Sequence, residues 1–486
     1  MAMKHPLRIV NYAVNGLGLG HITRLTAISR EVRRLATIAG INTEITFLTS
    51  SESDAICYAN GFASFKIPSK NSVGQARLAP HRYRKIAKQW IWNAVNVLSP
   101  DILVVDTFPA GSFNELYDIL DFGQKNVFIY RAVKQEVAEQ SSFQLVLRGY
   151  HAIIKPDEHG ANTSPIPEEC TERTTHVGEI LIRSRTEILL RHEARGILDI
   201  PEDATVVYCT IGGGGDSNAE ELLNAFQQLA TVNPQLLFVI GAGPLYRGKE
   251  IHGANIRWTQ RLIMMEYYNA FDCALTAGGF NSVNELLHCG VPCVFLPQER
   301  KYDDQFQRAE QYAEQGTGIV ATSLHSDELT THIKHVLINR ERFSKTAVNA
   351  VPKNCARDAA IEILSTLLQR SAIEEACELL LYAQQSQVLP YHDEHIYCEV
   401  LSALTSLSKI DGADASIVTT EHRATFATEC IIFAQNNNRT LRDVLKAIRA
   451  YKRLGLPTDI TNTVQQYILQ LPTETLTDTE QLTELL

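Results

Sequence analysis

The stretch that most strongly constrains the fold is TAGGFNSVNELLHCGVPCVFLPQERKYDDQFQRA, residues 276–309. It leaves an apolar strand candidate, residues 273–276, through two glycines and continues as an amphipathic helix. A Gly-Val-Pro turn leads into a second apolar run, residues 293–296, and another helical segment follows. Short apolar runs that alternate with helices are typical of parallel strands joined by crossover helices. This stretch therefore predicts an α/β domain.

The same alternation extends over most of the 486 residues, in two blocks. The strand candidates of the first block are residues 7–14, 43–48, 63–67, 101–105, 126–130 and 151–154. Those of the second block are residues 205–211, 236–240, 255–258, 273–276 and 293–296. Residues 155–175 contain three prolines and several polar residues, which favours a linker. After Arg370 the strand candidates stop, and residues 373–389, 392–407 and 441–454 have the pattern of helices.

We therefore predict an α/β protein with two tandem Rossmann-like, doubly wound domains and an all-helical region at its C-terminal end. The first domain is expected at residues 1–160, the second at residues 176–370 and the helical region at residues 371–486. Two open parallel sheets in tandem bind ligands in the crevice outside their carboxyl edges.

Composition and targeting signals narrow the class of protein. The N-terminus enters an apolar strand candidate almost at once, which leaves no room for a signal peptide. No apolar run approaches the ~18 residues that cross a bilayer, so we expect a cytoplasmic protein. The ten cysteines are scattered, and Cys289 and Cys293 have no second pair to complete a zinc site. We expect free thiols and no bound metal.

The charge is unevenly distributed along the chain. Residues 1–100 carry 13 Lys or Arg and four Asp or Glu, although the whole chain has a net charge of -10. The basic excess lies in residues 55–100, which contain no acidic residue. The core of this stretch, residues 77–92, combines clustered cations with two tryptophans, which suits an anionic membrane surface or a phosphorylated acceptor. The alternative is an ordinary crossover helix that packs Ile86 and Trp90 on the sheet and leaves its cations in solvent.

The loop after the first strand has the sequence NGLGLGH, residues 15–21. Glycines such as Gly18 and Gly20 let the backbone turn tightly before a helix, and His21 stands at the mouth of that helix. The loop lacks the last glycine of a dinucleotide fingerprint. The alternatives are a plain structural turn and an acceptor-side loop in which His21 takes part in chemistry.

Asp106 stands at the end of the fourth strand candidate, where parallel strands present their carboxyl ends. From there it could accept a hydrogen bond from one imidazole nitrogen of His21 and leave the other free to take a proton. The alternative is a carboxylate that caps the next helix.

Two loops of the second block are candidates for binding a donor. The first contains four consecutive glycines, including Gly213 and Gly214, but it lacks the Gly-Lys-Ser/Thr ending of a P-loop. It suits either a phosphate or a crowded domain boundary. The second is the 276–309 stretch, where Gly279, Asn281 and Ser282 lie at a helix start that can bind a diphosphate without metal.

Glu285 follows one turn into that helix and could accept both hydroxyls of a ribose. Asp304 and Gln305 begin the next helix with groups suited to sugar hydroxyls. The alternative for Glu285 is a charge on the helix surface.

Taken together, residues 7–370 resemble the GT-B superfamily of nucleotide-sugar glycosyltransferases. The segment AGGFNSVNE resembles the donor signature of UDP-sugar transferases, usually His-Cys-Gly-Trp-Asn-Ser-Thr-Leu-Glu. The resemblance implies a ribose-binding role for Glu285 and a diphosphate-binding role for Asn281 and Ser282. It implies sugar contacts for the Asp-Gln pair at Asp304 and Gln305.

The resemblance also reaches other parts of the chain. The Trp-Thr-Gln run at Trp258 and Gln260 is similar to the segment around the uracil, without its proline. GLGLGHITR, residues 16–24, resembles the Gly-rich loop of the bacterial enzyme that adds N-acetylglucosamine to the lipid-linked cell-wall precursor. His21 matches the base of plant-type UDP-sugar transferases, and Asp106 matches the aspartate that orients it.

Three features depart from the family pattern. Ala277 replaces the phosphate-binding histidine, so the diphosphate must depend more on backbone amides and on the four-glycine loop. Phe280 replaces the tryptophan. The helical region after Arg370 has no counterpart in the family.

The resemblance implies an inverting, metal-independent transfer from a UDP-sugar, with no cofactor. His21 would act as the base that Asp106 orients. The alternatives are a UDP-sugar 2-epimerase of the same fold and a non-catalytic nucleotide-sugar sensor. We expect an unidentified acceptor that is lipid-linked or phosphorylated, peripheral contact with an anionic membrane, and no nucleic-acid partner. Residues 371–486 carry eight Lys or Arg and sixteen Asp or Glu, and they are expected to mediate assembly or partner binding.

Overall fold

The computed structural model describes residues 5–14, 18–75, 77–156, 164–215, 218–300, 303–385, 394–407, 420–454 and 460–471. The chain divides into two compact units. The larger unit contains Pro6–Val32 and Thr43–Leu367 and holds both parallel sheets. The smaller unit contains Arg33–Asn42 and the helices from Leu368 onward.

The first sheet has seven parallel strands in the order β3-β2-β1-β4-β5-β6-β7. They are β1 (Leu7–Ala13), β2 (Thr43–Thr49), β3 (Ala63–Lys66), β4 (Ile102–Asp106), β5 (Lys125–Ile129), β6 (Ala152–Pro156) and β7 (Thr174–Val177). The strand order reverses between β1 and β4, so the crevice of this sheet lies at the carboxyl ends of those two strands. That position is where His21 and Asp106 follow β1 and end β4.

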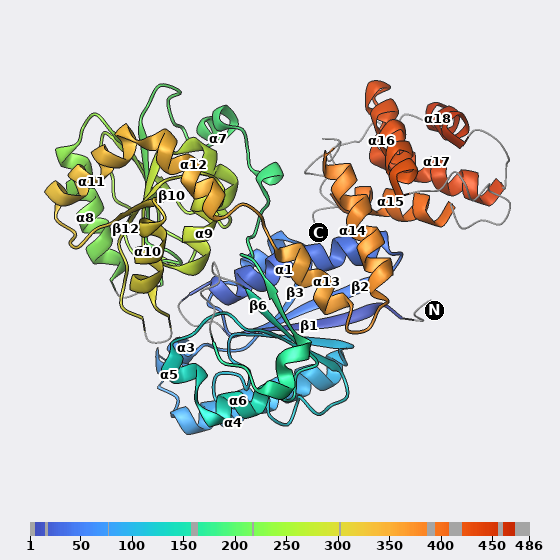
Figure 1. Ribbon diagram of the computed structural model, residues 1–486, viewed down its shortest axis with the longest axis horizontal. Coiled ribbons are helices and arrows are strands. Elements are labelled where there is room, and N and C mark those ends of the chain that lie inside the picture. Colours follow the sequence, from blue (N-terminus) through green and yellow to red (C-terminus); the bar gives the residue numbers. More distant parts are fainter. Residues whose placement is uncertain are drawn as a thin grey trace. The chain divides into compact units, whose positions relative to one another are not determined.

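Helices cover both faces of the first sheet. They are α1 (Gly20–Ile38), α2 (Ala55–Ala59), α3 (Lys70–Gln75), α4 (Pro80–Leu98), α5 (Gln135–Ala138), α6 (Ser141–Leu147) and the 3-10 turn η1 (Glu168–Arg173). Figure 1 shows α1 on one face and α4 and α6 on the other. The core on the α4 and α6 side is aliphatic and aromatic, and it includes Leu103, Val105 and Phe128 from the central strands.

The core of the basic stretch forms helix α4, which packs one face on the first sheet. The helix begins with Pro80, whose fixed φ suits a first helical position. It buries Ala87 and Ile91 against the domain. Ile86 and Trp90 are instead 42% and 40% exposed, so α4 packs on the sheet as an ordinary crossover helix does, but not through these two residues. The buried side chains of α4 form a stripe along one side of the helix. The helical period places Ile86 and Trp90 outside that stripe, so they face outward.

The second sheet has six parallel strands in the order β10-β9-β8-β11-β12-β13. They are β8 (Val206–Thr210), β9 (Leu237–Gly241), β10 (Ile256–Thr259), β11 (Cys273–Thr276), β12 (Cys293–Phe295) and β13 (Gly318–Val320). Around it lie η2 (Arg185–Glu187), α7 (Arg191–Ile197), α8 (Ala219–Val232), η3 (Met264–Ala270), α9 (Phe280–His288), α10 (Gln305–Glu314), α11 (Ser326–Ile338) and α12 (Arg340–Ala350). The following helix, α13 (Ala356–Leu364), returns to the first sheet. The strand order of the second sheet reverses between β8 and β11, and the donor stretch leaves β11.

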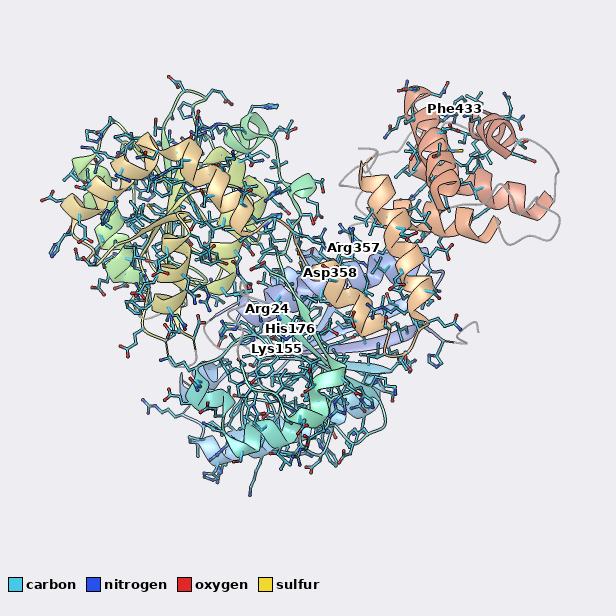
Figure 2. The ribbon with its side chains drawn as sticks, in the orientation of Figure 1. Arg24, Lys155, His176, Arg357, Asp358 and Phe433 are labelled. Carbon is cyan, nitrogen blue, oxygen red and sulfur yellow. The ribbon has the colours of Figure 1, made fainter. Side chains whose placement is uncertain are left out.

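The chain crosses between the two sheets twice. In the first crossing, between β7 and β8, the carbonyl oxygen of Ile182 accepts a hydrogen bond from Arg30 at 2.7 Å. On the way back, α13 contacts β6 and β7 of the first sheet, next to which Figure 1 draws it. Arg357, labelled on α13 in Figure 2, forms an ion pair with Glu31 at 2.9 Å. These contacts tie both sheets into the larger unit.

The smaller unit is helical in the part of it that the structure describes. It contains α14 (Arg370–Gln385), α15 (Glu394–Leu407), α16 (Thr420–Asn436), α17 (Leu441–Leu454) and α18 (Ile460–Gln470). Thr440 and Asp443 exchange hydrogen bonds at the start of α17, which caps that helix. Its apolar residues, among them Val444 and Ile448, are buried, and Arg442 and Lys446 are exposed.

The predicted fold class is confirmed, and the two sheets differ from the expectation only at their edges. Each predicted strand is present within two residues. The edge strands β7 and β13 were not predicted, because β7 has the polar sequence Thr-Thr-His-Val and β13 has only three residues. The predicted linker 155–175 contains the end of β6, η1 and the start of β7, and its residues 157–163 lie outside the described residues. Among the described residues, no helix is long and apolar enough to cross a membrane.

Candidate active site

A cleft of about 630 Å³ is lined by residues from the carboxyl edges of both sheets. It brings together most of the predicted site residues. From the first domain these are Gly18, Gly20 and His21, and from the second they are Gly213, Gly279, Asn281, Ser282, Glu285 and Gln305. Asp106 lies behind His21, and Gly214, Trp258, Gln260 and Asp304 do not line the cleft.

His21 and Asp106 meet at the crevice of the first sheet. The Nδ1 atom of His21 lies 3.3 Å from Oδ2 of Asp106, and the His21 side chain is 18% exposed. The contact orients the imidazole and leaves Nε2 as the nitrogen for proton transfer. The Asp106 carboxylate is fully buried and also accepts a hydrogen bond from the Thr107 hydroxyl at 2.8 Å. It does not cap the following helix, so the capping alternative fails.

Arg24 is a third member of this cluster that the sequence analysis missed. Its Nη1 donates to both carboxylate oxygens of Asp106, at 3.0 and 2.7 Å. Burial opposes ionisation of Asp106, but Arg24 and then His21 hold the pKa of its carboxyl below the usual value. Arg24 lies on α1, where Figure 2 labels it, three residues after His21. That spacing puts both side chains on one face of the helix, which is the signal that could have identified it.

The donor side of the cleft is built on the N-terminal end of α9. The helix starts directly after Gly279, and no side chain caps its first turn. The backbone amides of a first turn lack partners within their helix, so they suit an anion such as a diphosphate. Asn281 and Ser282 lie in this turn and line the cleft. The Asn281 amide also donates to the carbonyl oxygen of Gly20 at 3.3 Å, which links α9 to the loop of His21.

Glu285 lies one turn further into α9 and lines the same cleft. Its side chain is not a surface charge, since the residue is only 9% exposed. Burial raises the pKa of Glu285 to about 8, although Arg183 opposes this shift. The carboxyl is therefore largely protonated at neutral pH, and it faces a cleft from which hydrogen-bond donors could reach it.

The two glycine-rich loops of the second domain pack against each other. Gly214 has a φ of 81°, and a Cβ there would lie 2.3 Å from the Ala242 carbonyl oxygen. Gly243 has a φ of 72°, and its Cβ would lie 2.2 Å from the Gly212 carbonyl oxygen. Gly214 therefore serves close backbone packing, whereas Gly212, Gly213 and Gly243 line the cleft. The end of this loop, Asp216 and Ser217, lies outside the described residues.

The structure assigns Asp304 and its neighbour different tasks from those expected. Asp304 is exposed and caps α10, because its side chain accepts a hydrogen bond from the Gln307 amide at 3.0 Å. Asp303 lines the cleft instead and contacts Arg131 and Arg308, each at 2.8 Å. These arginines outweigh the effect of burial and hold the pKa of Asp303 far below its usual range. Gln305 is buried and accepts from the Gln298 amide at 3.0 Å.

Trp258 and Gln260 support the cleft without lining it. The Trp258 ring packs against Tyr246 with centroids 5.7 Å apart, and the residue is partly buried against the core of the second domain. Gln260 donates to the carbonyl oxygens of Gly243 and Tyr246, at 2.9 and 3.0 Å. The residues that line this part of the cleft are Arg261, Leu262, Ile263 and Met264. Arg261 is the one charged residue of the four and the others are apolar, so no motif in the sequence selected them.

Among the residues that the structure describes, no three His, Cys, Asp or Glu side chains cluster in a way that could hold a metal ion. Arg131 of the first domain and Asp303 of the second form an ion pair at the cleft, at 2.8 Å.

Comparison with known proteins places this geometry in a family context. Residues 217–363 match the model of the glycosyltransferase family 28 C-terminal domain. A 139-residue segment is 31% identical to the UDP-N-acetylglucosamine–N-acetylmuramyl-(pentapeptide) pyrophosphoryl-undecaprenol N-acetylglucosamine transferase of Aquifex aeolicus, and it covers 27% of this chain and 40% of that relative. The chain thus matches less than half the length of that curated relative. An uncharacterized glycosyltransferase of Methanosarcina mazei is 22% identical over 68% of this chain and 90% of its own length.

Solved structures agree on the architecture. The glycotransferase of kitacinnamycin covers 75% of this chain with all of its own, at a TM-score of 0.55 and 15% identity. Spinosyn forosaminyltransferase covers 76% of this chain with all of its own, at a TM-score of 0.53 and 14% identity. The chain therefore has the GT-B fold of the nucleotide-sugar glycosyltransferases, with a second domain similar to the glycosyltransferase family 28 C-terminal domain.

Proposed function

We propose that this protein is an inverting, metal-independent glycosyltransferase that moves a sugar from a UDP-sugar to an acceptor hydroxyl. The observation that carries the proposal is the cleft itself. One wall holds a histidine oriented by a buried carboxylate, and the other holds an uncapped helix start followed by a buried glutamate. The names of the Aquifex and Methanosarcina relatives support a glycosyl transfer.

The residues on the two walls of the cleft account for the steps of this reaction. His21 takes the proton of the acceptor hydroxyl as its oxygen attacks the anomeric carbon of the donor sugar. The new bond from carbon to the acceptor oxygen forms as the bond to the diphosphate oxygen breaks. UDP leaves with the bonding electron pair, and the first-turn amides of α9 stabilise its developing charge. A single displacement inverts the configuration at the anomeric carbon.

The donor is held by the second domain. Glu285 accepts hydrogen bonds from the ribose hydroxyls, and Asn281, Ser282 and Gly213 contact the diphosphate. Because Asp304 caps α10, Gln305 and Asp303 are the side chains of this segment that face the sugar. The residues from Arg261 to Met264 form the wall of the cleft for the base. No cofactor is required, because the leaving group is activated by amides and not by a cation.

The acceptor is proposed to reach the first domain from a membrane surface. The Aquifex relative acts on an undecaprenol-linked compound by its name. Here α4 exposes Ile86 and Trp90 beside the exposed cations Arg82, Arg84 and Lys85. Each cation near an anionic bilayer contributes about 1 kcal/mol, so several together give a salt-sensitive, peripheral attachment. We therefore expect a cytoplasmic protein that works at the membrane face.

The test is a panel of nucleotide sugars, with release of the nucleoside diphosphate measured in the presence of EDTA. We expect a UDP-sugar to be consumed, and the rate to be the same with and without chelator. Consumption that stops with EDTA and returns with Mg²⁺ or Mn²⁺ would contradict the metal-independent mechanism. Isomerisation of the UDP-sugar without release of UDP would support a 2-epimerase instead.

A further inference from the structure

The guanidinium groups of two arginines, one from each domain, lie over the ring of Phe280. The Cζ atom of Arg24 lies over the ring, 5.1 Å from its centroid. The Cζ atom of Arg308 also lies over the ring, at 5.8 Å. Arg24 belongs to α1 beside the first sheet, whereas Arg308 belongs to α10 beside the second. Cations within about 6 Å of an aromatic centroid are attracted by the ring, and more strongly where water is excluded.

Each of these buried arginines is held by a carboxylate. Arg24 is 2% exposed and contacts Asp106, which also contacts His21. Arg308 is 6% exposed and contacts Asp303, which also contacts Arg131 of the first domain. A continuous series of contacts therefore runs from His21 across the cleft to α9 and α10 and back to the first domain. A buried guanidinium held by a carboxylate has little freedom to move, so it fixes the ring that it faces.

Phe280 is the first residue of α9, immediately before Asn281 and Ser282. Arg308 strengthens this start of the helix, because it also donates to the carbonyl oxygen of Gly278 at 2.6 Å. The two arginines thus hold the segment that begins the donor helix, and one of them also holds the carboxylate of the His21 pair.

We propose that Phe280 is a positioning residue for the transfer step. Its ring, attracted by Arg24 and Arg308, sets α9 against His21, so that the rate of transfer depends on its aromatic face and the affinity for UDP does not. This inference rests on the proposed function. Phe280 itself lines the cleft, directly before Asn281 and Ser282. Misplacement of reacting groups by about 1 Å can cost on the order of 100-fold in rate, so a modest contact suffices.

The test compares three variants of the full chain. Phe280→Leu keeps an apolar side chain of similar size but removes the aromatic face, and Phe280→Tyr keeps the face. Leu286→Ala is the matched control, because it removes a fully buried side chain from the same helix and so also weakens α9. We expect Phe280→Leu to lower kcat about tenfold or more while the Kd for UDP stays within about threefold. Phe280→Tyr should retain most of kcat, and Leu286→Ala should lower the melting temperature without the same loss of kcat.

A second measurement does not depend on activity. Hydrogen exchange of the α1 segment from His21 to Arg24 should be faster in Phe280→Leu than in the parent, and unchanged in Leu286→Ala. If the parent protein transfers no sugar, the proposed function fails, while the exchange rates still decide whether the ring restrains Arg24. The positioning role is overturned if Phe280→Leu keeps the parental kcat and exchange, if it loses no more kcat than Leu286→Ala, or if UDP affinity falls as much as kcat.

Discussion

The two walls of the cleft differ in the surroundings and ionisation of their buried carboxyl groups. On the first-domain wall, Asp106 is ionised and its oxygens are occupied by Arg24, His21 and Thr107. On the second-domain wall, the first turn of α9 has no side-chain cap, and Glu285 is buried with a pKa raised to about 8. The Asp106 carboxylate has its partners within the protein, whereas the first turn of α9 and Glu285 face the cleft. This difference is what the proposed division of roles requires, in which the first wall orients the base and the second binds the donor.

Removing the base should give the largest effect. We expect His21→Ala to lower the rate of transfer by about 10²–10⁴-fold, because general-base assistance to the acceptor hydroxyl is lost. Asp106→Asn should be impaired in the same step, since the imidazole loses its orienting charge. Steady-state kinetics with a saturating UDP-sugar would measure both. Transfer at the parental rate in either variant would reduce the pair to a structural contact.

The free energy of unfolding should depend on pH because Glu285 is buried. A carboxyl with a raised pKa holds its proton in the folded protein after the unfolded chain has lost it. Its contribution to the free energy of unfolding is therefore constant below about pH 4.5, falls by about 1.4 kcal/mol per pH unit toward pH 8, and is constant above that. Glu285→Gln should remove this decline. Denaturant unfolding of both proteins between pH 5 and 9 would test it, and identical slopes would show that Glu285 is not buried as described.

UDP binding should change the ionisation of Glu285. Ribose hydroxyls donate hydrogen bonds, and an ionised carboxylate accepts them more strongly than a protonated one. We expect UDP binding near pH 7 to release a proton from Glu285 in the parent protein and not in Glu285→Gln. Calorimetry in two buffers with different heats of ionisation measures that proton. An equal proton release in both proteins would place the ionisation elsewhere.

The exposed side of α4 should bind anionic vesicles but contribute little to the chemistry of a soluble acceptor. We expect the protein to sediment with anionic vesicles at low salt, and to stay in solution with neutral vesicles or at high salt. Changing Arg82, Arg84 and Lys85 together to Ser should abolish sedimentation, whereas changing the buried-face residue Ala87 to Ser provides a control that keeps the surface charge. Unchanged sedimentation of the triple variant would leave α4 as a solvated face.

The helical unit should have the smallest effect on the cleft. None of the residues that line the cleft belongs to it, and its predicted role is assembly or partner binding. A chain that ends at Arg370 should bind UDP with parental affinity while its oligomeric state or partner capture changes, as light scattering would show. Loss of UDP binding in a truncated protein with intact circular dichroism would contradict this division.

The sequence predicted the fold well because strands and helices leave periodic patterns, and it predicted the site where glycines and polar residues follow strands. It did not predict which of several neighbouring side chains faces the cleft. Asp303 and Asp304 are adjacent and identical, yet one faces the cleft and the other caps α10. Trp258 packs against the core, whereas Thr259 and Arg261 line the cleft. Arg24 could have been found from its helical spacing to His21, but its partners Asp106 and Phe280 are distant in sequence.

The division of labour between the two walls is tested most directly by one paired measurement: UDP affinity and the rate of transfer, determined together for Glu285→Ala and His21→Ala. A lost hydrogen bond between a charged acceptor and its ligand costs about 1.5–3 kcal/mol, so we expect Glu285→Ala to weaken UDP binding by about 10- to 100-fold while its circular dichroism stays that of the parent. His21→Ala should bind UDP as the parent does and transfer almost no sugar. Unchanged UDP affinity in Glu285→Ala, or a loss of UDP binding in His21→Ala that matches its loss of activity, would contradict the account.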